Sequence, residues 1–389
     1  MSEGSPPFTE TALLSRDAVG RQIVSIHAKR TYRLLPSGAC VSAEAQQPLL
    51  TINRAGGDPV LETDVIPYKT NTDLIVLASA HAPSPGTRKM LASIALGKSR
   101  WDYAIFGERR CSFRGKGAIA FSEPEPLEKI PIRHENAYGG VDEQVPDPPV
   151  RTVVDAFQPH PGIYPRNSAG RGYVVHEKAE AIEGLSLPNV ELPGHLLTPQ
   201  NLVTGGPENW WRQPLPWSCD WFHNAWYPRA AFYGALPPFL PDDDSEVAEV
   251  RRGWIEPGQN RRFAVQRNED AMDSRLGNAA SPALVLPFLR GDEAIQLTGM
   301  TPDGQIVVRL PGEQPRMLLR FEGKVHEIQS VPHRVLVSTD EMGVYVVWHG
   351  AWLTPRELPD RLPEPGEDAS MELEGIEVMV DRRPVAPLV

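Results

Sequence analysis

Proline constrains this chain more than any other residue type, because it occupies 40 of the 389 positions, roughly double its usual share of ~5%. A prolyl residue has no backbone N–H and a fixed φ, so it interrupts helices and is excluded from central strands. We therefore expect short strands, turns and packed loops instead of long helices. Prolines are frequent between residues 121 and 285, where regular hydrophobic patterns break down.

Strand patterns lie on both sides of this proline-rich region. Residues 23–32 are enriched in β-branched side chains, and two alternating runs around Gly97-Lys98 predict a hairpin. Residues 88–96 alone could also form a helix. Short apolar runs recur between residues 294 and 348 at the ~8–12-residue spacing typical of a sandwich or barrel. The sequence thus predicts a mainly β protein with antiparallel, sandwich- or barrel-like sheets, an irregular Pro-rich centre and a few short helices.

Four regions follow from these patterns. They are an N-terminal β region (1–120), an irregular Pro/Trp-rich central region (121–285), a C-terminal β region (286–352) and an extended, Pro- and Glu-rich tail (353–389). Two short helices are expected in the centre, at residues 245–252 and 269–276, because each stretch stops at a glycine.

Charge and cysteine content argue against several classes of protein. Fifty acidic residues against 39 basic ones leave a net charge of −11, which argues against a binder of nucleic-acid backbones and suits a basic protein partner. Cys40, Cys111 and Cys219 are odd in number and widely separated, so they predict neither disulfides nor a zinc site. No apolar run approaches the ~20 residues that span a bilayer, and no secretory signal is visible. We expect a soluble protein of a reducing compartment, without metal, cofactor or membrane contact.

Fragments that resemble catalytic motifs are all incomplete. Gly97-Lys98-Ser99 resembles the end of a phosphate-binding loop, but Ala92 stands where that loop needs its first glycine. The segment His134-Glu135-Asn136-Ala137-Tyr138 carries a tyrosine at the second ligand position of a zinc-binding helix. His176-Glu177 and His326-Glu327 lack a second histidine as well, and no nucleophile elbow occurs. These absences predict that the protein is not an enzyme.

One aromatic segment is a candidate for partner binding. Residues 210–233 hold five of the nine tryptophans, namely Trp210, Trp211, Trp217, Trp221 and Trp226. Trp and Arg dominate binding hot spots, although an irregular region must also build its core from large rings. Our hypothesis is that the exposed members of this set contact a partner, with Arg229 and two further arginines nearby.

Those two arginines, Arg166 and Arg171, are bracketed by glycines in the segment from Tyr164 to Tyr173. Glycines permit a close approach of backbones, so the guanidinium groups could clamp a carboxylate or the backbone of a partner. Alternatively, the loop folds on itself and the arginines donate hydrogen bonds to its own carbonyl groups. The residues alone leave both interpretations open.

A set of short blocks in a fixed order carries a family resemblance. The blocks are Pro67-Tyr68-Lys69 with Thr72-Asp73 and His81-Ala82-Pro83, Phe106-Gly107-Glu108-Arg109, Ala137-Tyr138-Gly139-Gly140, Tyr164-Pro165-Arg166-Asn167 to Gly172, Leu187-Pro188-Asn189-Val190-Glu191, Trp226-Tyr227-Pro228-Arg229, Leu289-Arg290-Gly291-Asp292-Glu293 and Leu310-Pro311-Gly312. In these blocks the chain resembles bacterial adaptor or chaperone proteins of type VI secretion systems, also labelled domain of unknown function 2169. Tyr138 departs from the usual Phe, and Ser168-Ala169 from the more frequent Pro-Val.

The resemblance implies a non-enzymatic role. Such adaptors bind a cognate toxic effector in the cytoplasm, often through its N-terminal or PAAR-like region, and help to load it onto the VgrG spike. It also implies a structural role for the motif residues Tyr138, Gly139, Gly140, Asn167, Gly170, Gly172 and Asn189.

Two other functions stay open from the residues themselves. A β-rich hydrolase of cell-wall carbohydrate would need a cleft with two carboxyl groups ~5–10 Å apart. A structural component of the secretion apparatus would assemble into symmetric homo-oligomers.

Overall fold

The computed structural model describes residues 8–17, 19–51, 62–114, 118–146, 160–205, 212–232, 274–358 and 376–382. The chain divides into two compact units, each drawn from segments that are distant in sequence. The first unit comprises Met1–Val76, Asn268–Ile295 and Val307–Val389, and the second comprises Leu77–Arg267 and Gln296–Ile306.

The first unit is built almost entirely from strands. In chain order its elements are β1 (Thr9–Arg16), β2 (Gln22–Leu34), β3 (Cys40–Ser42), β4 (Thr72–Leu77), η4 (Ser274–Gly277), η5 (Pro282–Leu284), β14 (Val285–Leu286), β17 (Pro315–Phe321), β18 (Lys324–Ile328), β19 (Val331–Ser338), β20 (Gly343–Leu353) and β21 (Ile376–Arg382).

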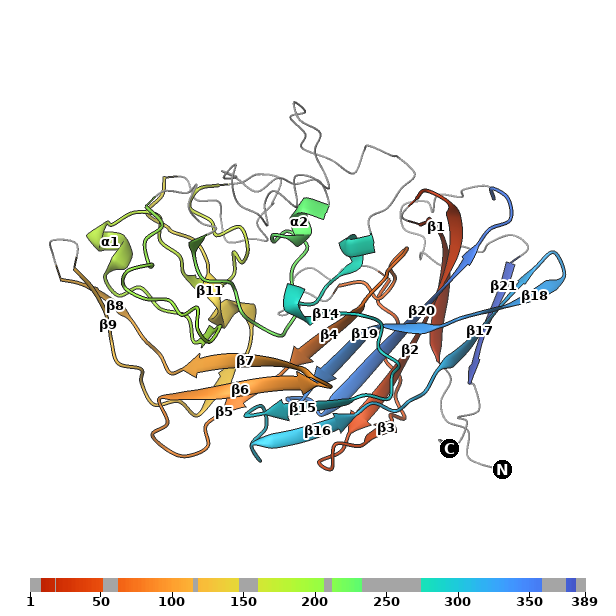
Figure 1. Cartoon of the computed structure of the whole chain (residues 1–389), viewed down its shortest axis with the longest axis horizontal. Coiled ribbons are helices and arrows are strands. Elements are labelled where there is room, and N and C mark those ends of the chain that lie inside the picture. Colours follow the sequence, from red (N-terminus) through yellow and green to blue (C-terminus); the bar gives the residue numbers. More distant parts are fainter. Residues whose placement is uncertain are drawn as a thin grey trace. The chain divides into compact units, whose positions relative to one another are not determined.

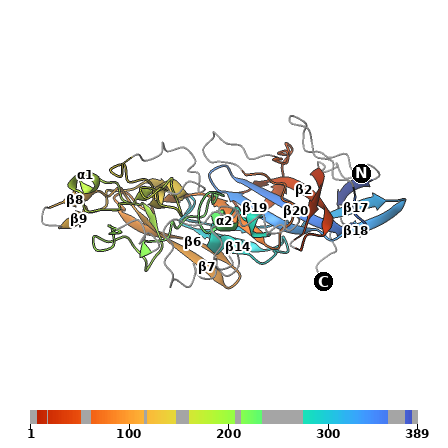
Figure 2. The same ribbon diagram turned by 90° about the horizontal axis from the view of Figure 1, so that it is seen from above.

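The main sheet of this unit has seven strands in the order β1-β2-β20-β19-β4-β14, with β3 paired to β2. The long strands β2 and β20 pair antiparallel from Ile23 opposite Leu353 to Arg33 opposite Gly343, and β19 lies on the other side of β20 (Figures 1 and 2). A second, three-stranded sheet has the order β18-β17-β21. Residues of β2 are buried on both faces of the main sheet, Arg33 excepted.

The two faces of β2 differ in polarity because successive side chains alternate between them. Val24, Ile26 and Ala28 share one face, whereas Ser25, His27, Lys29 and Thr31 share the other. Burying a polar or charged group is unfavourable unless it finds a partner. The polar face of this sheet therefore requires partners from the segments that cover it.

The second unit combines short strands with long irregular loops. In chain order its elements are β5 (Ser79–His81), β6 (Lys89–Leu96), β7 (Ser99–Phe106), β8 (Cys111–Phe113), β9 (Ile119–Phe121), β10 (Lys129–Pro131), η1 (His134–Asn136), β11 (Tyr138–Gly139), β12 (Arg171–Gly172), α1 (Ala179–Ile182), β13 (Val190–Glu191), α2 (Arg229–Phe232), β15 (Ala294–Thr298) and β16 (Gln305–Arg309).

The largest sheet of the second unit has the order β13-β7-β6-β15-β16. The hairpin predicted around Gly97-Lys98 is confirmed: β6 and β7 pair antiparallel from Lys89 opposite Phe106 to Leu96 opposite Ser99. Gly97 has a φ of 58°, which suits glycine at a tight turn. Gly97-Lys98-Ser99 thus form a hairpin turn between β6 and β7, although their sequence resembles the end of a phosphate-binding loop.

The irregular loops of the second unit enclose a core of their own. Tyr138, Tyr164 and Tyr173 are buried in one cluster with smaller apolar residues. The Tyr138 and Tyr164 rings lie 5.0 Å apart and nearly perpendicular, and the Tyr164 and Tyr173 rings lie 5.3 Å apart. Aromatic pairs in such arrangements are favourable beyond the area that they bury. Large aromatic rings thus form the core here, where prolines exclude regular helices and strands.

The prediction of a mainly β fold with a few short helices is confirmed. Each strand order runs from one edge strand to another, so the described sheets are open. The helix expected at 245–252 lies outside the described residues. So do residues 269–273 of the second expected helix (269–276), whereas Ser274–Gly277 form a turn of 3-10 helix. Within the predicted tail, β21 pairs with β17 over seven residues.

Candidate functional site

The motif residues of the second unit bring two loops into backbone contact. β11 and β12 pair in parallel, with Tyr138 opposite Arg171 and Gly139 opposite Gly172. A Cβ atom on Gly139 would lie 2.1 Å from the Asn167 carbonyl oxygen, and Gly139 has a φ of 147°. Only glycine fits where a backbone approaches so closely in this conformation.

The side chains of two asparagines in the motif blocks donate hydrogen bonds to backbone carbonyl oxygens of these loops. Asn167 is fully buried, and its Nδ2 donates to the carbonyl oxygens of His134 at 2.7 Å and Tyr138 at 3.1 Å. Asn189 is buried as well, and its Nδ2 donates to the Phe106 carbonyl oxygen at 3.1 Å. Buried carbonyl groups of irregular loops need such partners.

Arg171 joins three loops through its guanidinium group. Nε donates to the Glu135 carbonyl oxygen at 3.0 Å, Nη1 to Asn189 Oδ1 at 3.1 Å and Nη2 to Asn136 Oδ1 at 2.8 Å. Glu108 Oε1 lies 3.6 Å from Nη1, and the arginine side chain is 30% exposed. These contacts tie the segment from Tyr164 to Tyr173 to neighbouring loops of the same unit, and the Arg171 side chain stays partly exposed.

Arg166 lies on the same loop and is half-buried. Burial raises the pKa of the neighbouring Tyr164 hydroxyl to about 12, and the charge of Arg166 and its side-chain hydrogen bond to Tyr164 oppose that rise. Tyr164 thus stays a neutral hydrogen-bonding group at physiological pH, and its hydroxyl donates to the Pro214 carbonyl oxygen at 2.9 Å.

The tryptophan segment packs onto these loops mainly through buried rings. Trp221 and Trp226 are 7% and 8% exposed, and Trp226 Nε1 donates to Ser168 Oγ at 3.1 Å. Trp217 is half-buried, and its Nε1 donates to the Asp102 carbonyl oxygen at 2.8 Å. Trp210 and Trp211 lie outside the described residues.

Arg229 belongs to the interior as well. It is 5% exposed, and its Nη1 donates to the Phe222 carbonyl oxygen at 2.8 Å. Trp221, Trp226 and Arg229 therefore offer little surface to a partner. Among the described residues of the proposed contact set, Trp217, Arg166 and Arg171 retain accessible surface.

A buried contact between His134 Nδ1 and Asp220 Oδ1 links the tryptophan segment to the motif block at 134–140. The His134 ring lies against Phe222 and Trp226, with ring centres 5.6 and 5.0 Å away. Asp220 Oδ1 also accepts a hydrogen bond from Ser218 Oγ at 2.7 Å. A serine nucleophile would instead bond to the imidazole, so these three residues hold loops together and do not form a triad.

Further bonds bring the predicted arginine loop and the tryptophan segment together. Tyr227 N donates to the Pro165 carbonyl oxygen at 3.0 Å, and Tyr138 Oη donates to Gln213 Oε1 at 3.0 Å. From composition alone, we grouped the arginine loop and the tryptophan segment as one candidate surface for a partner. The structure joins them through a set of specific backbone and side-chain contacts.

The first unit contains a buried histidine cluster that the sequence reasoning missed. The rings of His27, His333 and His349 lie 5.2 to 6.1 Å apart, measured between ring centres. A β-bulge between Pro332 and Arg334 shifts the register of β19 at His333, and such a bulge re-aims side chains. The available signal was the run of polar residues at alternate positions of β2.

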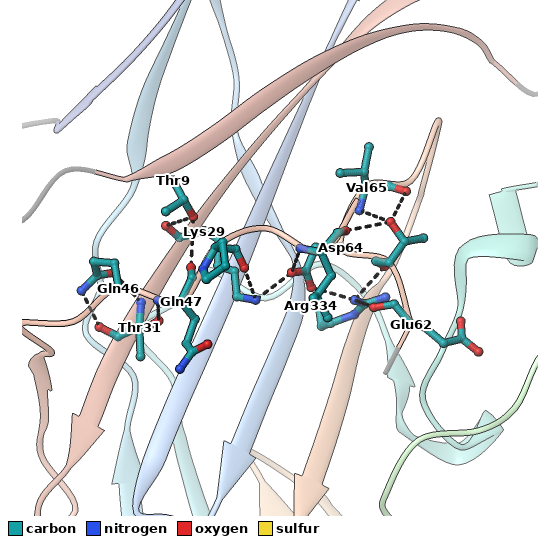
Figure 3. A network of polar contacts seen from close by, with 12 residues as sticks. Thr9, Lys29, Thr31, Gln46, Gln47, Glu62, Asp64, Val65 and Arg334 are labelled. Atoms are coloured by element: carbon teal, nitrogen blue, oxygen red, sulfur yellow. Dashed lines mark hydrogen bonds and ion pairs between the residues drawn. The ribbon is translucent and has the colours of Figure 1, made fainter. Parts of the chain in front are cut away.

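Charged side chains surround this cluster on the polar face of the main sheet. Asp64 accepts from Lys29 Nζ at 2.7 Å and from Arg334 Nη1 at 2.9 Å (Figure 3). Lys69 and Asp73 form a second ion pair at 2.5 Å, and both side chains are fully buried. The polar face of the main sheet thus carries charged side chains that are paired with opposite charges, next to three neutral imidazole rings.

Titratable groups in both units are perturbed mainly by burial. Desolvation raises the pKa of the Cys111 thiol to about 12 and that of Cys40 to about 11, so neither is a thiolate at neutral pH. All three cysteines are free. Across the part of the chain that the structure describes, no group of three His, Cys, Asp or Glu residues could hold a metal ion, and no helix is long and apolar enough to cross a membrane.

Comparisons with known proteins place the chain by family. Neither the comparison with curated proteins nor that with solved structures gave a match. A family model described as "Uncharacterized protein conserved in bacteria (DUF2169)" matches residues 19–349, a range that includes strands of both units. The chain therefore belongs to the DUF2169 family of conserved bacterial proteins.

Proposed function

We propose that this protein is a non-enzymatic adaptor of a type VI secretion system. In this role it binds the N-terminal or PAAR-like region of a cognate secreted effector. It then helps to load that effector onto the VgrG spike. The proposal rests on the ordered motif blocks and the family resemblance that they carry. It is a protein-binding function, and no cofactor enters it.

The observation that carries the proposal is the use of the motif side chains. Asn167, Arg171 and Asn189 all bond to other loops of the second unit instead of converging on an open reaction centre. Bonds of this kind hold irregular loops in one conformation. A rigid surface loses less conformational entropy on binding, which favours affinity for a single client.

The contact surface that fits this function is the accessible part of the tryptophan segment. Leu215 is 38% exposed, and Trp217 two residues later is half-buried. An exposed leucine two residues from a partly exposed indole is a suitable anchor for an apolar side chain of a client. The net charge of −11 favours a client with a basic binding region.

A pull-down of the tagged full chain from its native cytoplasm, followed by mass spectrometry, tests the proposed function. We expect one effector-like protein together with a spike protein, in near-stoichiometric amounts. Recovery of the protein alone as a symmetric oligomer would support a structural component. Release of sugars when the purified protein is incubated with cell-wall carbohydrate would support the hydrolase. Self-assembly alone or sugar release would each contradict the adaptor function.

The proposed surface is tested separately once a client is in hand. Leu215→Asp should weaken client binding at least tenfold, since a hot-spot residue contributes ~1.4 kcal/mol or more. Leu91→Asp is the matched control, because Leu91 is 60% exposed on β6 of the same unit. Equal affinities of the two variants would show that the client binds elsewhere.

A further inference from the structure

The histidine cluster of the first unit is unusual in its hydrogen bonding. His27 and His333 are fully buried and His349 is 4% exposed. Both ring nitrogens of His333, Nδ1 of His27 and Nε2 of His349 have no hydrogen-bond partner. Buried polar atoms without partners are rare and destabilising. A neutral imidazole tolerates such a site far better than a charged imidazolium.

The remaining ring nitrogens hold one loop segment against the sheet. Nε2 of His27 lies 2.9 Å from the carbonyl oxygen and 3.1 Å from the amide nitrogen of Ile66. His349 bonds to the backbone of Pro67. These contacts belong to residues 62–68, which we call the latch segment.

The latch segment is also held by charges. Within it, Asp64 pairs with Lys29 of β2 and Arg334 of β19. Lys69 directly follows the segment and pairs with Asp73 of β4.

The charged and titratable groups around the three rings are therefore nearly all paired. β2 contributes Lys29, β4 contributes Asp73, β19 contributes Arg334 and β20 contributes Tyr345. The latch segment contributes Asp64, and Lys69 directly follows it. The cations Lys69 and Arg334 disfavour a further positive charge on these rings. They disfavour a metal ion at this place for the same reason.

We propose that His27, His333 and His349 form an acid-sensitive latch, which holds residues 62–68 on the main sheet while the rings are neutral and releases them when the rings become protonated. A protonated His27 carries a hydrogen on both ring nitrogens, so Nε2 no longer accepts from the Ile66 N–H and can only donate to the Ile66 carbonyl oxygen. Three imidazolium groups would also repel one another and the neighbouring Lys69 and Arg334. The inference concerns the first unit and is independent of the client surface proposed for the second unit.

The direction of the pH dependence follows from burial. Desolvation lowers the pKa of His27 to about 4, and that of His333 and His349 well below the ordinary value, with the neighbouring cations adding to the effect. The backbone bonds of His27 to Ile66 and of His349 to Pro67 act in the opposite direction and do not reverse the shift. In the released state the rings regain a pKa of ~6.5. The closed state is therefore fully stable above about pH 6.5 and loses stability as the pH falls toward 4. Each ring that becomes exposed multiplies the opening constant by up to about tenfold per pH unit.

Hydrogen exchange of the full chain, read by mass spectrometry and corrected for intrinsic rates, tests the latch. At about pH 5 we expect exchange of residues 62–68 to be at least about thirtyfold faster than at about pH 7, the contribution of one imidazole over ~1.5 pH units. His333→Leu removes no hydrogen bond, so it should fold and should reduce the acceleration about tenfold or more. His195→Gln, at an exposed histidine of the second unit, should leave it unchanged. Equal exchange at the two pH values, or equal acceleration in His333→Leu and the unmodified protein, would overturn the proposal.

A second measurement covers the case in which His333→Leu does not fold. In the unmodified protein with labelled histidines, NMR should show the rings of His27, His333 and His349 staying neutral as the pH falls until the segment opens. Titration of all three buried rings near ~6.5 with the segment still protected would refute the latch.

Discussion

The buried Lys69–Asp73 ion pair gives the sharpest test of how the first unit is held together. Both side chains are fully buried, and the two charged atoms lie 2.5 Å apart. Lys69 Nζ also donates to the Gly277 carbonyl oxygen at 3.2 Å, and Asp73 Oδ2 accepts from Ala279 N at 2.7 Å. The pair thus ties the turn after the latch segment to β4 and to residues 277–279.

The perturbation is a double-mutant cycle made of Lys69→Met, Asp73→Asn and the combined variant. Each single change leaves one charge buried without its counter-charge, which costs about 3–5 kcal/mol of unfolding free energy. Met and Asn keep the approximate shapes of the side chains that they replace, and an Asn at position 73 can still accept from the Ala279 N–H. The combined variant leaves no uncompensated charge, so its loss should be about 1–3 kcal/mol, well below the sum of the single losses.

Urea unfolding of the full chain measures these losses. With a slope of about 2–3 kcal/mol/M, each single variant should lower the midpoint by about 1–2 M. Thiol labelling locates the effect, because Cys40 lies in the first unit, whereas Cys111 and Cys219 lie in the second. We expect faster labelling of Cys40 in the single variants and unchanged labelling of the other two. If the combined loss equals the sum of the single losses, the pair does not act as a unit and the reasoning is wrong.

Three further changes test individual contacts by the same unfolding measurement. Gly139→Ala should destabilise the second unit by more than about 2 kcal/mol, since its Cβ would meet the Asn167 carbonyl oxygen and its φ suits glycine; full stability would refute the close approach. Met342→Asn should stabilise by about 0.5–1 kcal/mol, because Met342 has a φ of 50° that Asn tolerates better; a loss would show that the methionine packing matters more. Trp217→Phe should cost about 1–2 kcal/mol through the lost bond to the Asp102 carbonyl oxygen, and no change would mean that this bond contributes nothing.

Much of the strand content could be predicted because it depends on local pattern. The hairpin around Gly97 and the strands near residues 23–32 and 316–321 appear where alternation and turn residues indicated them. Proline density likewise predicted an irregular centre, because the constraint on φ acts within a single residue. Such features need no contact with distant parts of the chain.

The candidate sites were harder to predict because they depend on contacts between distant segments. Composition identified the tryptophan segment, yet the exposure of Trp217 and the burial of Trp226 follow from the loops that pack against them. The partners of Arg171 lie 18 to 36 residues away. No short-range pattern shows which carbonyl group an arginine will meet.

The sequence by itself determined the β class, the irregular proline-rich centre and the motif blocks that identify the family, because these depend on residue type and near-neighbour spacing. Tertiary structure alone decided that His27, His333 and His349 meet. That meeting requires β2 to pair with β20 and β20 with β19, and it requires a bulge that turns His333 onto the polar face. Pairing register is a property of the whole sheet, since it is selected by the faces that can be buried together.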